Sequence, residues 1–289
     1  MIFMKKIICL ILSILLLLSF TACEEPTPAS DFEYVVSKEH VTITKYLKND
    51  ETVIIPEIIE NKPVMVIGMC SFIGNESLKT VKIPDSVIRI DSAAFSMCNS
   101  LTNVEFGEGV INIESDAFQN CVSLEEIELP KSVERIGSNA FSGCSLLEDV
   151  HLSENLKEIG SYAFSECTSL KEINIPKTLT TWGEAAFYND TSLTEINFEE
   201  GLTKIGYAAF KCATSLEEVT IPASVTELSD IAFTVCDSLK EVTFLGDVPK
   251  EVGGYVFGPP NKNIKIYYNG SAKGWDTTTL KDDYTLVKK

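Results

Sequence analysis

The stretch Ala117–Gly137 reads AFQNCVSLEEIELPKSVERIG, and the chain repeats its pattern 23 residues later, from Ala140, as AFSGCSLLEDVHLSENLKEIG. Phenylalanine recurs at this interval at positions 72, 95, 118, 141, 164, 187, 210 and 233. Other residues keep the same register: a leucine stands six residues after each Phe, and a valine or isoleucine stands nine after it. A fixed period of this length is the signature of a stacked repeat.

The repeat can be written A-F-x-x-C-x-S-L-x-x-I-x-I-P-x-S-V-x-x-I-G. Its I-x-I element alternates with period two, which predicts a short strand with one buried face. One unit is too small to enclose its own apolar residues, so the units must stack and bury them against each other, with a parallel sheet along one side. Four units end this strand with proline, where a missing amide donor is tolerated: Pro84, Pro130, Pro176 and Pro222.

The repeat resembles the BspA-like, or treponemal-class, leucine-rich repeat. The resemblance rests on Cys98-Asn99-Ser100-Leu101 and its equivalents, on the Ala-Phe pair and on the Ile-Pro strand end, and it covers about Gly68 to Val248. It implies a leucine-rich repeat solenoid of the α/β type, with eight 23-residue units between residues 68 and 248. We expect a β cap at 31–67, in which Phe32–Val36 and Val41–Lys45 form a hairpin and Thr52–Pro56 a third strand, and a second cap at 249–289.

Residues 1–22 have the composition of a signal peptide, with Lys5 and Lys6 before an apolar run. Cys23 follows the small Ala22, which resembles a bacterial lipobox, although Phe20 replaces the usual leucine. We therefore predict acylation of Cys23, a tether at 23–30, and an extracellular protein anchored to the bacterial membrane by its N-terminal lipid. Ordinary secretion with cleavage nearby is the alternative.

The acidic composition limits the classes of partner. Removal of residues 1–22 leaves 22 basic and 42 acidic residues, a net charge of −20. Nucleic acid is not expected, because phosphate binding needs a cationic face. We expect a monomer that contacts the membrane only through its lipid.

No pattern of catalytic or cofactor-binding residues appears, so we predict no enzyme activity, no cofactor and no metal site. Five cysteines stand three residues after the repeat Phe, at the period of the fold rather than at a metal-binding spacing, and we expect packed, reduced thiols: Cys98, Cys121, Cys144, Cys167 and Cys236. Only two histidines occur, His40 and His151. Trp182 stands in a column otherwise held by isoleucine or leucine and is expected to be buried.

One column of outward-facing residues suggests a function. Eight residues after the Phe, six consecutive units carry a carboxylate: Glu126, Asp149, Glu172, Glu195, Glu218 and Glu241. A solvated face that keeps the array soluble is one interpretation, and a surface for a basic partner is the other. Calcium is less favoured, because no loop supplies six to eight oxygens. We predict a non-catalytic adhesion or binding module for a protein or glycan, with a structural spacer as the alternative; Tyr162, Tyr188 and Tyr207 are a second candidate contact patch.

Overall fold

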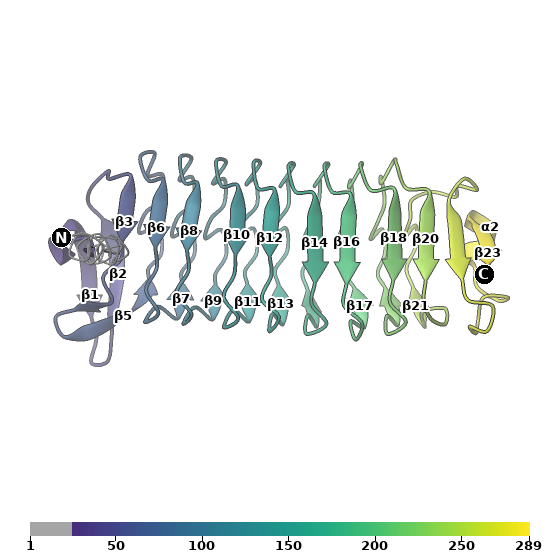
Figure 1. Cartoon of the computed structure of the whole chain (residues 1–289), viewed down its shortest axis with the longest axis horizontal. Coiled ribbons are helices and arrows are strands. Elements are labelled where there is room, and N and C mark those ends of the chain that lie inside the picture. Colours follow the sequence, from purple (N-terminus) through teal and green to yellow (C-terminus); the bar gives the residue numbers. More distant parts are fainter. Residues whose placement is uncertain (1–24) are drawn as a thin grey trace, which may run out of the picture.

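The computed structural model of the chain describes residues 25–289. About 11 turns of about 23 residues are stacked along one axis, and the N-terminal hairpin and the last strands lie at opposite ends (Figure 1). Most turns contribute two short strands, so two sheets run along the molecule. The leucine-rich repeat solenoid predicted from the sequence is confirmed.

The first strand of each turn, the I-x-I element, builds a set of parallel strands that we call sheet I. Ile127 and Ile173 point into the core and are almost completely buried, while the residues on either side of them are exposed. The strands are β3 (Thr52–Ile54), β6 (Thr80–Lys82), β8 (Asn103–Glu105), β10 (Glu126–Glu128), β12 (Asp149–His151), β14 (Glu172–Ile175), β16 (Glu195–Phe198), β18 (Glu218–Ile221), β20 (Glu241–Phe244), β22 (Lys265–Tyr268) and β23 (Thr285–Lys288).

The second strand of each turn belongs to sheet II, which also contains the N-terminal hairpin. Its strands are β1 (Phe32–Val36), β2 (Val41–Tyr46), β4 (Ile58–Ile59), β5 (Lys62–Ile67), β7 (Arg89–Ile90), β9 (Asn112–Ile113), β11 (Arg135–Ile136), β13 (Glu158–Ile159), β15 (Thr181–Trp182), β17 (Lys204–Ile205), β19 (Glu227–Leu228) and β21 (Glu251–Val252). The Ala-Phe segments between the sheets are turns. The structure differs here from the α/β-type repeat that we expected, because the one α-helix within residues 25–289 is α2 (Leu280–Asp283), near the C-terminus.

Sheet I is divided into short blocks. The pairing is interrupted between β8 and β10, between β12 and β14, and between β16 and β18. Where Glu199 and Leu245 stand at the proline position, their amides donate to the preceding turn, to Ile175 O and Ile221 O, each at 3.0 Å. Proline has no N–H, so this bond is missing wherever a block begins. The strands that begin the three blocks are followed by Pro130, Pro176 and Pro222.

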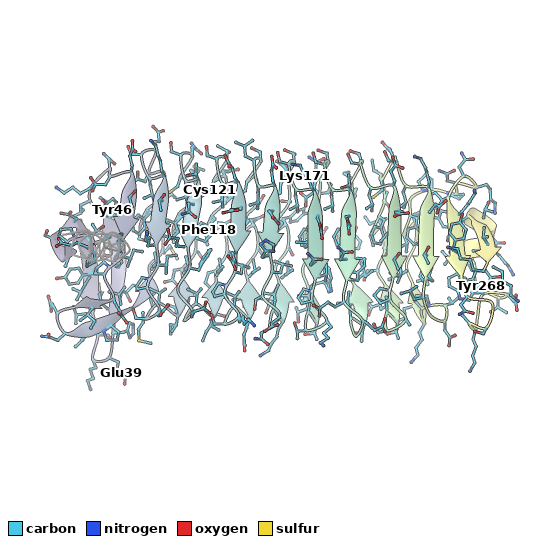
Figure 2. All side chains as sticks on the ribbon, in the orientation of Figure 1. Glu39, Tyr46, Phe118, Cys121, Lys171 and Tyr268 are labelled. Atoms are coloured by element: carbon cyan, nitrogen blue, oxygen red, sulfur yellow. The ribbon has the colours of Figure 1, made fainter. Side chains whose placement is uncertain are left out.

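The repeat phenylalanines form a continuous column in the core. From Phe95 to Phe233, neighbouring ring centroids are 5.1–5.5 Å apart and the ring planes differ by 1–11°. These rings are fully buried, and Phe118 is labelled in Figure 2. Stacked aromatic pairs contribute about 0.5–1.5 kcal/mol beyond the burial of their area, so the column stabilises each interface between turns.

The in-register cysteines lie beside this column as free, buried thiols, as predicted. Each thiol donates to the carbonyl of the Phe that lies 26 residues earlier; for Cys121 the Sγ–O distance to Phe95 is 3.2 Å. The same contact forms at Cys98, Cys144, Cys167 and Cys236. Burial raises the pKa of the Cys98 thiol to about 11 and that of Cys144 to about 12.

Trp182 departs from our expectation, because it is half-buried rather than buried. The pairing of sheet II stops between β15, which contains Trp182, and β17. A Cβ built on Gly206 in the next turn would lie 2.6 Å from Trp182 Cβ, so only glycine fits against the tryptophan. An indole is larger than the isoleucine side chain of this column, and here its buried Nε1 has no partner within residues 25–289.

Aromatic side chains close the C-terminal end of the core. Phe257 stacks on Phe233 at 5.6 Å, and Tyr284 packs edge-on against Phe257 at 5.7 Å. At the other end, β1 and β2 form the antiparallel hairpin that we predicted. The expected third strand forms as β3, but it joins sheet I and pairs with β6. Within residues 25–289, no helix has the length and apolar character needed to cross a membrane.

Candidate functional site

The six carboxylates predicted as a contact surface lie in one straight column on the outward face of sheet I, and we call this column the acidic ladder. Glu126 is aligned with Asp149, Glu172 with Glu195, and Glu218 with Glu241 in the paired strands. Five of the six side chains are exposed and Glu241 is half-buried. Strand pairing fixes the spacing within each of these three pairs, whereas the steps from Asp149 to Glu172 and from Glu195 to Glu218 cross interruptions of sheet I.

Neutral groups and one histidine contact the acidic ladder. The Nδ2 of Asn197 donates to Glu172 Oε1 at 2.9 Å and to Glu195 Oε1 at 3.0 Å, and so bridges two rungs. The Tyr267 hydroxyl donates to Glu241 Oε1 at 3.2 Å. His151 Nε2 lies 3.6 Å from Asp149 Oδ2. Amide and hydroxyl donors hold the carboxylates in place without cancelling their charge.

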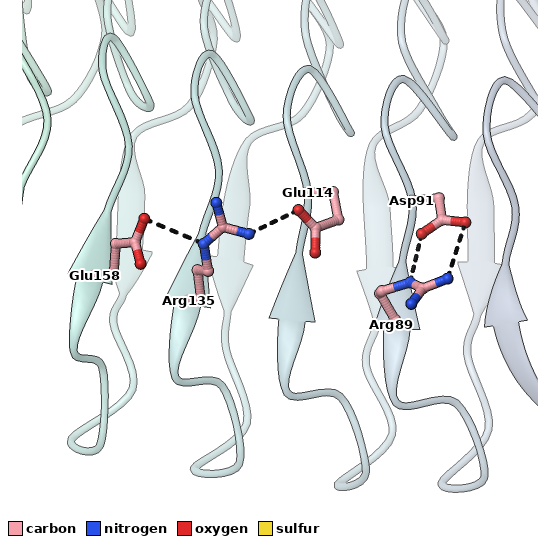
Figure 3. A network of polar contacts seen from close by, with 5 residues as sticks. All are labelled: Arg89, Asp91, Glu114, Arg135 and Glu158. Carbon is pink, nitrogen blue, oxygen red and sulfur yellow. Dashed lines mark hydrogen bonds and ion pairs between the residues drawn. The ribbon is translucent and has the colours of Figure 1, made fainter.

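Lysine and arginine side chains pair instead with acids outside the ladder. Lys171 Nζ lies 2.5 Å from Glu148 Oε2 in the turn before it, and Figure 2 labels this lysine. On sheet II, Arg135 joins three turns through Glu114 at 2.9 Å and Glu158 at 3.1 Å (Figure 3). Further pairs between neighbouring turns are Lys131–Glu154, Lys157–Glu134, Lys204–Glu227 and Lys240–Glu217.

A groove of about 660 Å³ lies beside the N-terminal rungs of the ladder, at the interruption between β8 and β10. The turn before the interruption packs closely on its predecessor, because a Cβ at Gly107 would lie 2.4 Å from the carbonyl carbon of Pro84. The groove lies on the opposite side of this turn, toward β10. Partly or fully buried apolar side chains and charged side chains line it together: Glu105, Phe106, Glu126, Glu128, Leu129, Lys131, His151 and Leu152.

These residues are suited to binding. The groove offers carboxylates to cations and an apolar floor to the hydrocarbon part of a side chain. The Ser153 hydroxyl at its edge is used to join two turns, since it donates to Lys131 O of the preceding turn at 3.1 Å. Within residues 25–289, no group of three or more His, Cys, Asp and Glu side chains is arranged to hold a metal ion.

The three tyrosines of the second candidate patch come together on the edge formed by the Ala-Phe turns. Tyr162 and Tyr188 meet edge to face, with centroids 6.4 Å apart. Tyr207 lines the same basin of about 250 Å³. The sequence indicated their proximity only by their occurrence in three successive units.

Asp190 occupies the repeat position that cysteine holds in five other units. The side chain is fully buried, its Oδ1 accepts from Cys167 N at 2.9 Å, and its Oδ2 has no partner in the part of the chain that the structure describes. Burial raises the pKa of this carboxyl well above its usual value. The column position itself was the signal that could have revealed the burial.

Cys23, the predicted lipidation site, lies outside the described residues. The chain is fixed to the solenoid shortly after it, because Thr27 N donates to Ile54 O at 2.9 Å and Thr27 Oγ1 accepts from Ile54 N at 3.0 Å. Four positions separate Thr27 from Cys23 in the sequence.

Comparison with known proteins supports the family expected from the repeat. The profile of the BspA type leucine rich repeat region matches residues 65–192 and 160–273, with six copies. A leucine-rich repeat protein of T. pallidum is 31% identical, with a TM-score of 0.62 over 74% of this chain and 91% of its own. A leucine rich cell surface protein of Faecalibacterium prausnitzii is 20% identical, with a TM-score of 0.38 over 87% of this chain and 97% of its own. No curated protein matches the sequence. The chain belongs to the BspA-type leucine-rich repeat family, whose repeat arrays are general scaffolds for protein interaction.

Proposed function

We propose that this protein is a non-catalytic binding or adhesion module of the cell surface, and that the acidic ladder contacts a protein or glycan partner that carries basic groups. One observation supports this most directly: the six carboxylates lie on one face of sheet I, while lysines such as Lys171 pair with acids outside the ladder. Like charges directly opposite each other in a sheet are destabilising. A column of them therefore calls for a compensating role.

Solubility alone is a weaker reason for the ladder. The chain has many other exposed acids, and charges scattered over the turns would keep it soluble with less mutual repulsion. A structural spacer, the alternative function, would need no coherent field on one face. The ladder and the neighbouring groove together favour binding over the spacer.

The expected mode of binding combines attraction at a distance with a local contact. The summed field of the ladder would attract a basic partner and speed its association. At the groove, an arginine or lysine side chain could lay its hydrocarbon stem on Phe106 and Leu129 and reach Glu128 with its charged end. The other carboxylate, Glu105, is already paired with Lys82 at 3.3 Å. Exposed ion pairs are individually weak, so affinity would come from many rungs acting together.

We also propose the location. The signal-like residues 1–22 and the lipobox-like Cys23 support export and a lipid anchor. The cell-surface description of the related F. prausnitzii protein agrees with this location. Because four positions separate Cys23 from Thr27 in the sequence, a lipid on Cys23 would hold the N-terminal cap near the membrane and leave the rest of the ladder accessible.

The test compares two variants with the same change in charge. The protein is immobilised, and its association with a short poly-L-lysine probe and with extracellular matrix proteins and glycans is followed as salt is raised. Changing Glu172, Glu195 and Glu218 to glutamine should slow the association of whichever of these molecules binds the parent protein. The control neutralises exposed acids outside the ladder, with the changes Glu39→Gln, Glu76→Gln and Asp237→Asn. Equal rates for the two variants would contradict the proposal.

A further inference from the structure

The tyrosine basin has the geometry of a small binding site rather than of a chance cluster. Tyr162 and Tyr207 expose 37% and 43% of their surfaces, and Tyr188 stands between them as a partly buried wall. The three rings come from three consecutive turns. Ala185 and Ala208, each 3% exposed, form the floor because their small side chains leave the space open.

The walls of the basin are held by the backbone. Tyr162 N donates to Glu184 O at 2.8 Å, and Ala185 N donates to Tyr207 O at 2.9 Å. Asn189 N donates to Lys211 O at 2.9 Å in the same stack of turns. Rings on such a support lose little freedom when a ligand binds, which favours affinity. Tyrosine also offers a large contact area with few rotatable bonds.

The polar groups of the basin indicate the charge of its ligand. The rim carries one acid, Glu184, and one cation, Lys211, whose Nζ lies 5.7 Å from the Tyr188 ring centroid. These two charges balance locally, in a chain that is otherwise strongly acidic. A basic ligand would be favoured by the acidic ladder instead, and an anion would meet Glu184. The basin therefore suits a neutral ligand with both apolar and hydrogen-bonding surfaces.

From these features we infer that the tyrosine basin is a binding subsite for one neutral sugar ring. A pyranose has an apolar face of C–H groups that packs on an aromatic ring, and hydroxyls at its edge that can bond to Glu184 and Lys211. The volume of about 250 Å³ lies just below the range of drug-sized ligand pockets. An extended proline-rich peptide fits less well, because it needs an elongated groove for successive residues. This inference does not depend on the acidic ladder.

The chain supplies a matched control for the experiment. Tyr255 holds the same repeat position as Tyr162, two residues before the repeat Phe, and has the same left-handed backbone, with φ of 52° against 58°. It is 63% exposed and lies outside the basin. Tyr162→Ala and Tyr255→Ala therefore make the same chemical change on the same backbone, inside and outside the proposed subsite.

The probes are glucose, galactose, mannose, N-acetylglucosamine and their short neutral oligosaccharides, titrated against the full chain carrying 13C-labelled tyrosine. We expect saturable shifts of the Tyr162 and Tyr207 ring signals with at least one of these sugars. Tyr162→Ala and Tyr207→Ala should each weaken this binding about tenfold, which corresponds to about 1.4 kcal/mol. Tyr255→Ala should leave it unchanged, and so should a change of salt concentration.

Three outcomes would overturn the inference. One is that no probe binds saturably at concentrations up to about 20 mM, which would mean an affinity weaker than millimolar. Another is binding that Tyr255→Ala weakens as much as Tyr162→Ala does. The third is saturation of the basin by a proline-rich decapeptide but by no sugar. Loss of ladder-dependent binding to a basic partner would contradict the proposed function and leave this inference standing.

Discussion

Neutralising three consecutive rungs of the acidic ladder, with Glu172→Gln, Glu195→Gln and Glu218→Gln together, should stabilise the fold. Neighbouring strands in a sheet lie about 4.8 Å apart, so carboxylates in register are separated by about 5 Å. At that distance, two unit charges in water repel each other by about 0.8 kcal/mol. Salt at 0.15 M has a screening length of about 8 Å and reduces this repulsion by about half.

The structure determines how these pairs are weighted. Glu172 and Glu195 face each other within a paired block, and Glu218 faces Glu241 in the next block. The two steps on either side of the Glu172–Glu195 pair cross interruptions of sheet I, so we give each about half the weight of a paired step. The glutamine oxygens would accept the hydrogen bonds of Asn197 less strongly than the carboxylates do, and this loss offsets about 0.5 kcal/mol of the gain. The net gain is then about 0.5–1 kcal/mol at 0.15 M salt and about 1.5 kcal/mol at 0.01 M.

Unfolding in urea measures this gain, because urea is uncharged and leaves the screening unaltered. The free energy of unfolding is compared at about 0.01, 0.15 and 1 M salt, where the screening length falls from about 30 to 3 Å. The control is the off-ladder triple variant, which should gain less at every salt concentration. A ladder variant that is no more stable than the parent at the lowest salt, or whose gain persists at the highest, would refute the assumed repulsion.

The remaining predictions concern the core and the anchor. Leu170→Ala should lower the free energy of unfolding by about 2–5 kcal/mol, since Leu170 is fully buried, whereas Asn174→Ala should change it by less than about 0.5 kcal/mol; equal effects would contradict the inward and outward assignment. Because burial raises the pKa of Asp190, its contribution is complete below the unfolded-state value of about 3.8 and falls as pH rises toward the folded-state pKa. Asp190→Asn should therefore gain stability relative to the parent as pH rises above about 3.8, and a constant difference would argue against burial of the charge. The in-register thiols should resist alkylation in the folded protein and react fully after unfolding. Crosslinks between turns in most molecules, found by mass spectrometry, would contradict this prediction. Cys23→Ala should release the protein from the membrane fraction, and unchanged detergent partitioning would exclude the lipid anchor.

The repeat fold was predictable because each buried position recurs at one fixed interval. Phe118, Cys121, Leu124 and Ile127 each stand in a column of like residues, and every member of such a column meets the same surroundings one turn away. Conflicts within a column were harder to resolve. Trp182 was assigned to the core by its position, but the size of its ring keeps it half-buried.

The details of the site depended on contacts that no column contains. Tyr162, Tyr188 and Tyr207 stand at three different positions of the repeat, so only the stacking of the turns brings their rings together. The groove lies at the interruption of sheet I before the Pro130 unit, and no column of the repeat marks that interruption. Periodicity identified the acidic ladder, because it is a column of like residues, whereas the basin and the groove arise where the turns differ.

The two proposed surfaces can be separated by a single variable, because one acts through charge and the other is locally neutral. A partner held by the acidic ladder should associate more slowly as salt rises, and its rate should respond to Glu172→Gln, Glu195→Gln and Glu218→Gln. A neutral sugar held by the tyrosine basin should be indifferent to both and should be lost with Tyr162→Ala. The ladder and the basin have no residue in common. A glycosylated basic protein that uses both should therefore associate more slowly when the ladder is neutralised, and should dissociate faster with Tyr162→Ala. Its two responses would then identify which part of the partner each surface holds.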